Sequence, residues 1–316
     1  MLDIKEKRNV LVVGGAGFIG SHTVEGLIER GYEVLVFDNL STGSLKNLES
    51  VKDKITFING DVNDYKQISA VFQENSFNYV FAYAAVVGVQ RTLTDPINVL
   101  NDIEGIKNIL RLSKANKIKQ IFFSSSSEVY GEQIHFPLHE EHTPLNSRLP
   151  YAVVKNLGEV YLKAYQKHHG LNFTIFRFFN TYGPRQSEDF VITKFIKQAL
   201  KNEDIEIYGE GNQTRTFLYV KDNVEACLNA MGNKAAMNNV INIGGPEEIT
   251  ISQLAAKIKA LTESSAEIRK VAPLEEGDMQ RRKPAVEKMK SVLFGKEPIS
   301  IEEGVRKTID YFKSKN

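Results

Sequence analysis

The sequence predicts an α/β protein with a doubly wound parallel sheet, and three observations support this fold class. Short apolar runs such as 10–13 and 33–37 alternate with longer segments that have helical apolar spacing. A glycine-rich segment, 14–20, follows the first run, and an acidic residue, Asp38, follows the second. Because alternating strands and helices pack as a parallel sheet with helices on both faces, this order indicates one main sheet.

Each element is expected from its own pattern. Residues 10–13 are wholly apolar, as expected for a strand that is buried on both faces of a parallel sheet. Residues 21–30 have helical character and end at Gly31, a residue type that commonly ends helices. On the same grounds we expect further strands at 33–37, 54–58, 79–82, 120–123 and 173–178, and helices at 65–73 and 99–115.

The domain organisation follows from where this alternation stops. After Phe179 the chain becomes richer in turns and charged residues. We therefore expect residues 1–180 to form a main domain around the sheet, and residues 181–316 to form a smaller, mostly helical domain that binds the substrate. The apolar run 240–243 has the pattern of a strand, so the later segment is expected to return one strand to the main sheet.

Composition narrows the classes of function. The chain has 316 residues, 42% of them apolar and 25% charged, with a formal net charge of +1. This balance gives no electrostatic case for nucleic acid or an anionic membrane as partner. The apolar runs are shorter than a membrane span or a signal-peptide core, so we expect a soluble, cytoplasmic protein. A single cysteine, Cys227, excludes an internal disulfide, and no metal site is expected from the histidine spacing.

The glycine-rich segment has the pattern of a dinucleotide-binding turn. Residues 14–20 read GGAGFIG, which contains both G-x-G-x-x-G and G-x-x-G-x-x-G. Such glycines allow a tight turn close to a pyrophosphate, and the N-terminus of the following helix presents amide groups to that anion. Since a strand precedes the segment and a helix follows it, a Rossmann-like cofactor site is indicated. We expect the cofactor to contact Gly14, Gly15, Gly17, Phe18, Ile19 and Gly20.

The acidic residue after the second strand indicates which dinucleotide binds. A carboxylate at Asp38 can accept hydrogen bonds from a ribose and would repel a 2′-phosphate. No arginine immediately follows it, so the sequence favours NAD over NADP. We expect Asn39, Asp61 and Val62 beside the same cofactor. Asp61 follows the third strand and could reach the adenine, although a turn or cap residue is the alternative.

Tyr151 and Lys155 form Y-x-x-x-K and share one face of a helix. A tyrosine hydroxyl is a poor base at neutral pH, but a neighbouring ammonium and the cationic nicotinamide of NAD⁺ favour the phenolate. The phenolate could then take a proton from a sugar hydroxyl while hydride leaves the same carbon. A serine run, 124–127, lies upstream at the carboxyl end of the fifth strand, where ligands bind in such sheets.

At this point the chain resembles the extended short-chain dehydrogenases of the NAD-dependent epimerase/dehydratase family. The resemblance runs through nearly the whole chain. The segments that carry it are 14–20, Asp38–Asn39, Gly60–Asp61, the Ser-Glu-Val-Tyr-Gly run at 127–131, Tyr151 with Lys155, the Phe-Asn-Thr-Tyr-Gly-Pro-Arg run at 179–185, Tyr208–Gly209 and residues 213–222.

The resemblance implies roles for individual residues. Ser126 would share the sugar 4-hydroxyl with Tyr151, and Lys155 would also bond the nicotinamide ribose. Asn180 and Arg215 would bind the diphosphate of a nucleotide sugar, with Arg281 or Arg282 as a further contact, because arginine suits bidentate phosphate binding. A surface charge is the alternative for each arginine. We also expect Arg185, the last residue of the run at 179–185, to bind the substrate.

The resemblance also implies a cofactor, a substrate class and an assembly. NAD would be tightly held, and would be reduced and reoxidised within one turnover. The substrate would be a UDP-, dTDP- or GDP-sugar, and nothing in the residues selects the base. A homodimer through a four-helix bundle is implied, here formed by helices near 99–115 and 151–168. A binding module without turnover is a remote alternative, since the Tyr–Lys pair and the serine are all present.

The reaction itself stays open between three outcomes. Glu128 occupies the position of the C5 base in the dehydratases of the family, and decarboxylases carry similar Ser-Glu-Val-Tyr-Gly and Arg-Lys-Pro runs, here at 127–131 and 282–284. The run at 151–155 is more similar to epimerases. We expect 4,6-dehydration or decarboxylation, with 4-epimerisation as the alternative. Residues 82–91 depart from the His-Leu-Ala-Ala run of many relatives, which leaves the exact substrate undetermined.

Overall fold

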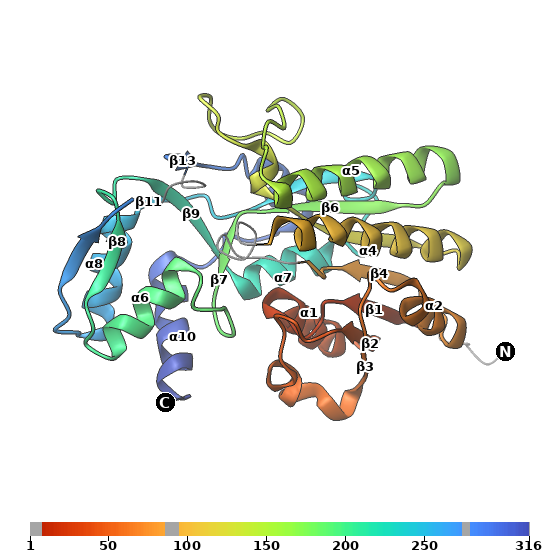
Figure 1. Ribbon diagram of the computed structural model, residues 1–316, viewed down its shortest axis with the longest axis horizontal. Coiled ribbons are helices and arrows are strands. Elements are labelled where there is room, and N and C mark those ends of the chain that lie inside the picture. Colours follow the sequence, from red (N-terminus) through yellow and green to blue (C-terminus); the bar gives the residue numbers. More distant parts are fainter. Residues whose placement is uncertain (1–7, 86–94, 274–278, 316) are drawn as a thin grey trace.

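A seven-stranded parallel sheet forms the centre of the molecule in the computed structural model, which describes residues 8–85, 95–273 and 279–315 (Figure 1). The strand order is β10-β6-β5-β4-β1-β2-β3. The chain runs outward from β1 to β3, and then returns to β4 on the other side of β1. This reversal opens a crevice beyond the carboxyl ends of β1 and β4, where ligands bind in open α/β sheets. The strands are β1 (Asn9–Val13), β2 (Glu33–Asp38), β3 (Ile55–Asn59), β4 (Tyr79–Ala82), β5 (Gln120–Ser126), β6 (Phe173–Phe178) and β10 (Asn239–Ile243).

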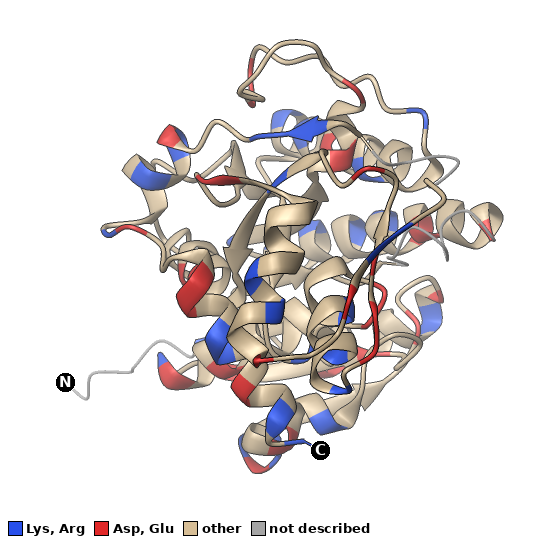
Figure 2. Cartoon of the chain, turned by 90° about the vertical axis from the view of Figure 1, so that its left-hand side faces the viewer, with Lys and Arg blue, Asp and Glu red and all other residues tan. Residues whose placement is uncertain are grey.

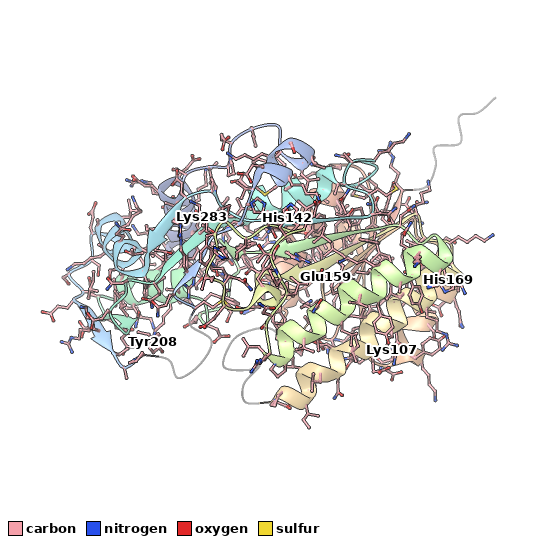
Figure 3. The ribbon with its side chains drawn as sticks, turned by 90° about the horizontal axis from the view of Figure 1, so that it is seen from above. Lys107, His142, Glu159, His169, Tyr208 and Lys283 are labelled. Carbon is pink, nitrogen blue, oxygen red and sulfur yellow. The ribbon has the colours of Figure 1, made fainter. Side chains whose placement is uncertain are left out.

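Helices cover both faces of this sheet, which explains why its central strands are apolar without interruption. In β1, Val10 and Val12 belong to one core cluster, whereas Leu11 and Val13 belong to the other. The first core packs against α1 (Phe18–Glu29) and α7 (Val220–Asn229), and the second against α2 (Tyr65–Glu74), α4 (Pro96–Ala115) and α5 (Pro150–His169). Viewed from above, α4 and α5 lie side by side along one face (Figure 3).

The later part of the chain adds smaller sheets beside the main sheet (Figure 1). In one of these sheets, β9 (Thr214–Tyr219) pairs with β11 (Glu248–Thr250), β13 (Arg281–Arg282) and β7 (Asn180–Tyr182). In the other, β8 (Ile205–Tyr208) pairs with β12 (Ile268–Val271). Around them lie α6 (Val191–Leu200), α8 (Ile251–Thr262), α9 (Glu287–Leu293) and α10 (Ile301–Lys313).

Several elements extend beyond the ranges expected from the sequence. α1 begins at Phe18 and α4 at Pro96, where Asp95 accepts a hydrogen bond from the Asn98 amide and proline occupies the first turn. β5 continues through the polar residues 124–126 because they stay paired with β6. A short 3-10 helix, η2 (Ser127–Tyr130), follows directly, and η1 (Leu45–Lys54) precedes β3.

Lys and Arg residues (blue) and Asp and Glu residues (red) are interspersed along the chain in Figure 2, where β13 is the blue arrow near the top. None of the helices within the described ranges is long and apolar enough to cross a membrane. The same ranges contain no cluster of three or more His, Cys, Asp or Glu side chains that could hold a metal ion.

Candidate active site

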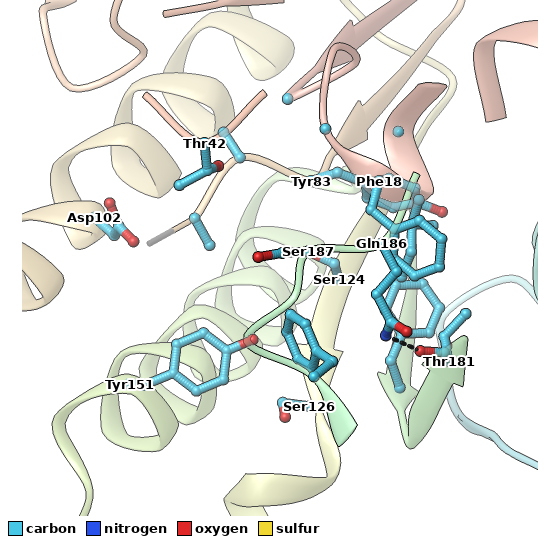
Figure 4. Close-up of a pocket in the computed structure, with 18 of the residues that line it drawn as sticks. Phe18, Thr42, Tyr83, Asp102, Ser124, Ser126, Tyr151, Thr181, Gln186 and Ser187 are labelled. Atoms are coloured by element: carbon cyan, nitrogen blue, oxygen red, sulfur yellow. Dashed lines mark hydrogen bonds between the residues drawn. The ribbon is translucent and has the colours of Figure 1, made fainter. Parts of the chain in front are cut away.

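A cleft of about 850 Å³ opens at the carboxyl ends of the central strands (Figure 4). Its walls include the turn between β1 and α1, the end of β2, the serine run 124–127 and the segment 178–192. The first half of α5 contributes Tyr151 and Lys155. Segments far apart in sequence thus meet at the point where the strand order reverses.

The turn between β1 and α1 leaves no space for side chains at two of its glycines. Gly14 has φ of +82°, and a Cβ there would lie 2.5 Å from the amide nitrogen of Ala84. A Cβ on Gly20 would lie 2.1 Å from the carbonyl oxygen of Gly14. Gly17 caps α1 without a side-chain hydrogen bond, so the first amides of the helix point into the cleft. This arrangement suits a pyrophosphate.

Asp38 lies at the end of β2, and backbone amides orient its carboxylate. The Ala16 amide donates to Oδ2 at 2.9 Å and the Leu40 amide donates to Oδ1 at 2.8 Å. The side chain is buried but lines the cleft, as does Asn39. A carboxylate fixed beside the glycine turn fits the ribose of a dinucleotide.

Asp61 and Val62 also line the cleft, next to Gly60. The Asp61 Oδ1 atom accepts a hydrogen bond of 2.8 Å from the Asn63 amide, which is the geometry of a turn residue. Asp61 therefore fills the turn role and also borders the cofactor end of the cleft.

Lys155 is buried in the cleft wall, and Tyr151, one helical turn before it, is partly buried. The Lys155 Nζ atom donates to Ser124 Oγ at 3.3 Å and lies 5.7 Å from the centre of the Tyr151 ring. Burial lowers the pKa of Lys155 to about 8, and the charge of Asp102 opposes that shift. Burial raises the pKa of Tyr151 well above its usual value, the charge of Glu128 adds to the shift, and a hydrogen bond with Ser126 opposes it. A cation beside the phenol is therefore needed to make Tyr151 a base near neutral pH.

Ser126 is the last residue of β5, Glu128 lies in η2, and an ion pair occupies this end of the cleft. Ser126 Oγ accepts a hydrogen bond of 3.1 Å from the Glu128 amide. The Glu128 Oε1 atom lies 2.7 Å from an Nη atom of Arg282, a side chain that is only 7% exposed. Glu128 Oε2 and Arg282 Nε are buried and have no hydrogen-bond partner. Both residues line the cleft, as does Ser126.

The two adjacent arginines of β13 point in different directions. Arg282 enters the cleft, whereas Arg281 lies outside its wall and binds Glu248 through two hydrogen bonds, of 2.8 and 2.7 Å. This alternation is that of a strand, in which successive side chains face opposite sides. Of the two sequence-predicted candidates, the structure brings only Arg282 into the cleft.

The other expected substrate contacts are placed unevenly. Asn180 lines the cleft, and its Nδ2 atom donates to the Thr216 carbonyl at 3.1 Å. Arg215 is buried, pairs across the strands with Arg282 and is not among the residues that line the cleft. Arg185 lines the cleft but also donates to Glu25, which helps hold the pKa of that carboxyl at about 2 although burial opposes the shift.

Several residues of the cleft were missed by the sequence analysis. α4 contributes Asp95, Asn98 and Asp102, whose spacing of three and four along a helix could have indicated a shared face. The segment 178–192 contributes Gln186, which donates to the Thr181 carbonyl at 2.7 Å (Figure 4). Tyr83, from the run that departs from the family pattern, also lines the cleft, whereas 86–94 lie outside the described residues.

These features define a class: an NAD-dependent enzyme of the Rossmann type, in which a Tyr–Lys pair and a serine line the same cleft as the glycine turn. A family model described as "NAD dependent epimerase/dehydratase family" matches residues 10–244, and the chain belongs to this family.

Relatives with different reactions are similar to the chain over almost its entire length. A UDP-N-acetyl-alpha-D-glucosaminuronate decarboxylase of Bacillus cytotoxicus is 37% identical, over 97% of this chain and 98% of the relative. A UDP-glucose 4-epimerase of Thermotoga maritima, solved with UDP-glucose, has a TM-score of 0.92 and 35% identity, over 97% of this chain and 99% of that one. A dTDP-glucose 4,6-dehydratase of Bacillus anthracis, solved with NAD, has a TM-score of 0.86 and 28% identity, covering 97% of each chain.

Two glycine substitutions should separate cofactor contact from folding. A Cβ on Gly17 would have only the Gly14 carbonyl nearby, at 3.3 Å, whereas a Cβ on Gly20 would collide with that carbonyl. We expect Gly17→Ala to weaken NAD binding at least about tenfold with the melting temperature of NAD-free protein almost unchanged. Gly20→Ala should cost about 1–3 kcal/mol of stability even without NAD. Calorimetric titration and thermal unfolding of stripped protein measure both, and a Gly17→Ala variant with wild-type NAD affinity would contradict the assignment.

Proposed function

We propose that this enzyme decarboxylates a UDP-hexuronate after oxidising the sugar at C4. The observation that carries the proposal is the ion pair at the reaction end of the cleft between Arg282, which is buried, and Glu128. A second candidate, 4-epimerisation of a UDP-sugar, uses the same oxidation step.

The oxidation requires a base at the sugar 4-hydroxyl. NAD, when bound, would supply the acceptor for the hydride that leaves C4. Tyr151 takes the hydroxyl proton, Ser126 holds the same hydroxyl, and Lys155 supplies the positive charge that stabilises the phenolate. These residues lie together in the cleft, and Lys155 is held by Ser124. All three reactions of the relatives can begin with this step.

Arg282 supports decarboxylation because of the substrate's charge. A C6 carboxylate is β to a C4 ketone, so carbon dioxide can leave without a base at C5. The site must therefore hold an anion in a dry environment rather than abstract a proton. Arg282 lines the cleft and Glu128 fixes its guanidinium, so the guanidinium can donate to a substrate carboxylate.

Dehydration has less support from the same residues. It requires a base for the C5 proton and an acid for the departing C6 hydroxyl. One oxygen of Glu128 is bound by Arg282, and the residue before Glu128 is a serine, Ser127, which is no acid. The Glu128 carboxylate thus has a cation to orient, which fits a positioning role better than proton abstraction.

The second candidate has its own supporting observation. A 4-epimerase needs only the oxidising residues and space for the keto sugar to rotate, and the cleft has a volume of about 850 Å³. The similarity to the Thermotoga maritima epimerase also extends over 97% of the chain. For either reaction we propose a UDP-sugar as the substrate. Asn180 would contact its diphosphate, and Arg215, which is buried and does not line the cleft, would contribute its positive charge.

We also propose a homodimer through α4 and α5. These helices carry large exposed apolar side chains at helical spacing: Ile97 (71% exposed), Leu100 (44%), Val153 (43%), Leu157 (42%) and Val160 (54%). Two such helices from each of two copies would form a four-helix bundle and bury these residues.

Turnover of two substrates in deuterated water should identify the reaction. With UDP-glucuronate we expect loss of carbon dioxide and one deuterium at C5 of the pentose product, seen by NMR. A dehydratase would instead act on UDP-glucose, placing deuterium at C5 and leaving a methyl group at C6. Retention of protium at C5 with inversion at C4 of UDP-glucose, and no reaction of UDP-glucuronate, would show that the enzyme is an epimerase.

Arg282→Gln should raise the KM for UDP-glucuronate by about tenfold or more, because a charge-assisted hydrogen bond to the carboxylate is worth about 1.5–3 kcal/mol. The matched control is Lys283→Gln, the next residue, whose ammonium lies 3.4 Å from Glu248 outside the cleft. Equal KM values for both variants and the wild type would show that Arg282 does not bind the substrate.

Tyr151→Phe should stop C4 oxidation and leave the fold and the NAD content intact, since the ring still packs and only the hydroxyl is lost. Enzyme-bound NAD should no longer be reduced when substrate is added, as followed by absorbance. A variant with near-wild-type turnover would show that another residue is the base.

Val160→Asp should convert the dimer to a monomer, because a charge in the centre of an apolar bundle cannot be solvated. Light scattering coupled to size exclusion measures the mass. Ile134→Asp is the control, as Ile134 is also exposed (87%) but lies in the loop after η2. A wild-type protein that is monomeric at micromolar concentration would contradict the proposed interface.

A further inference from the structure

Beneath the serine run lies a buried ion pair that the proposed chemistry does not use. Arg177 of β6 and Glu159 of α5 are 2% and 0% exposed, and an Nη atom of Arg177 lies 2.7 Å from Glu159 Oε2. A second bond of 2.9 Å joins Arg177 Nε to Glu159 Oε1. Figure 3 labels Glu159 near the middle of α5. Burying such a pair costs so much desolvation energy that it is weak support for stability by itself.

The ion pair binds both ends of the segment 125–130. At the start, Ser125 Oγ donates to Glu159 Oε1 at 2.6 Å. At the end, an Nη atom of Arg177 donates to the Tyr130 hydroxyl at 2.9 Å, and that hydroxyl donates to Asn242 of β10 at 2.7 Å. Ser126 and Glu128 lie between the two attachment points.

The same pair connects this segment to the catalytic helix. Glu159 lies one turn after Lys155 on α5, and Ser125 lies between the two serines that the site uses. Lys155 donates to Ser124, and Ser126 accepts from the Glu128 amide. Ser125 is also the register partner of Arg177 in the neighbouring strand. A shift of the ion pair would therefore move the lysine, the serine and the carboxylate relative to one another.

We propose that the Glu159–Arg177 pair is a positioning device, which fixes the segment 125–130 against α5. It thereby sets the geometry in which Lys155, Tyr151 and Ser126 act on the sugar 4-hydroxyl during oxidation at C4. The inference rests on the proposed C4 oxidation. It holds equally for decarboxylation and epimerisation, because both need that step.

The device should be visible in the pH dependence of kcat. The charged groups near Tyr151 are Lys155 on its own helix, Asp102 of α4 and Glu128 of η2. Glu128 forms an ion pair with Arg282. The rate requires the phenolate, so it falls as the pH falls through the pKa of Tyr151. If Lys155 loses its alignment, the phenolate loses a cation and its pKa rises. The acid limb of the profile then moves to higher pH, whereas partial unfolding lowers the rate equally at every pH.

The test uses NAD-loaded enzyme with UDP-glucuronate, or with UDP-glucose if only that sugar is turned over by the wild type. Ser125→Ala removes one attachment and keeps the ion pair. Glu159→Leu with Arg177→Met replaces the pair by apolar side chains, which often leaves stability unchanged. Lys163→Gln is the control, since Lys163 is half-exposed and its Nζ atom lies 3.7 Å from Glu159 Oε2.

We expect the double variant to melt near the wild type but to lose about tenfold or more in kcat, since small displacements of catalytic groups are costly. Its acid limb should move to higher pH, Ser125→Ala should show the same changes to a smaller degree, and Lys163→Gln none. Amide hydrogen exchange in 124–128 should quicken in both test variants. Should the double variant fail to fold, Ser125→Ala decides. The inference would be overturned if a folded test variant had the kcat, the acid limb and the amide exchange rates of the wild type. A wild-type enzyme that turns over neither sugar would instead count against the proposed function.

Discussion

The turn between β1 and α1 has no room for a side chain at Gly14 or Gly20, and this restriction fixes the position of the rest of the cleft. Gly14 lies against the backbone of Ala84 at the end of β4, so the N-terminus of α1 is held directly beside the point where the strand order reverses. A pyrophosphate bound at that N-terminus would leave one ribose of the dinucleotide near Asp38 at the end of β2 and direct the other half along the carboxyl edge of the sheet, toward β5 and α5.

The opposite end of the cleft is assembled from elements that are distant in sequence. Glu128 follows β5, Arg282 belongs to a strand of two residues, and Tyr151 belongs to α5. Hydrogen bonds on both sides hold β13: the Thr214 amide donates to the Gln280 carbonyl, and the Leu138 amide to the Lys283 carbonyl. Tyr151 and Glu128 thus belong to elements of the main sheet and its helices, whereas Arg282 comes from the smaller sheet.

The fold could be predicted from sequence because its signals are local. Buried parallel strands are continuous apolar runs, and the glycine turn, Asp38 and the Tyr151–Lys155 spacing each lie within one short segment. The partnerships across the molecule could not be predicted in this way. Sequence offered Arg281 and Arg282 equally, and only the pairing of β13 with β9 determines which one faces the cleft. The Glu159–Arg177 pair depends on how two strands and a helix are aligned. Asp102 could not be distinguished in sequence from the other polar residues of an amphipathic helix.

Cys227, the only sulfhydryl of the chain, lies in α7 with its side chain fully buried, and its Sγ atom lies 3.6 Å from Asn223 Oδ1. Burial raises the pKa of this thiol to about 12, although a hydrogen bond with Tyr83 opposes the shift. The thiolate that alkylating reagents and oxidants attack is therefore scarce in the native protein. A cysteine introduced on the surface could be coupled to a fluorophore without removing the native one, so movements around the cleft can be followed spectroscopically in an otherwise unmodified enzyme.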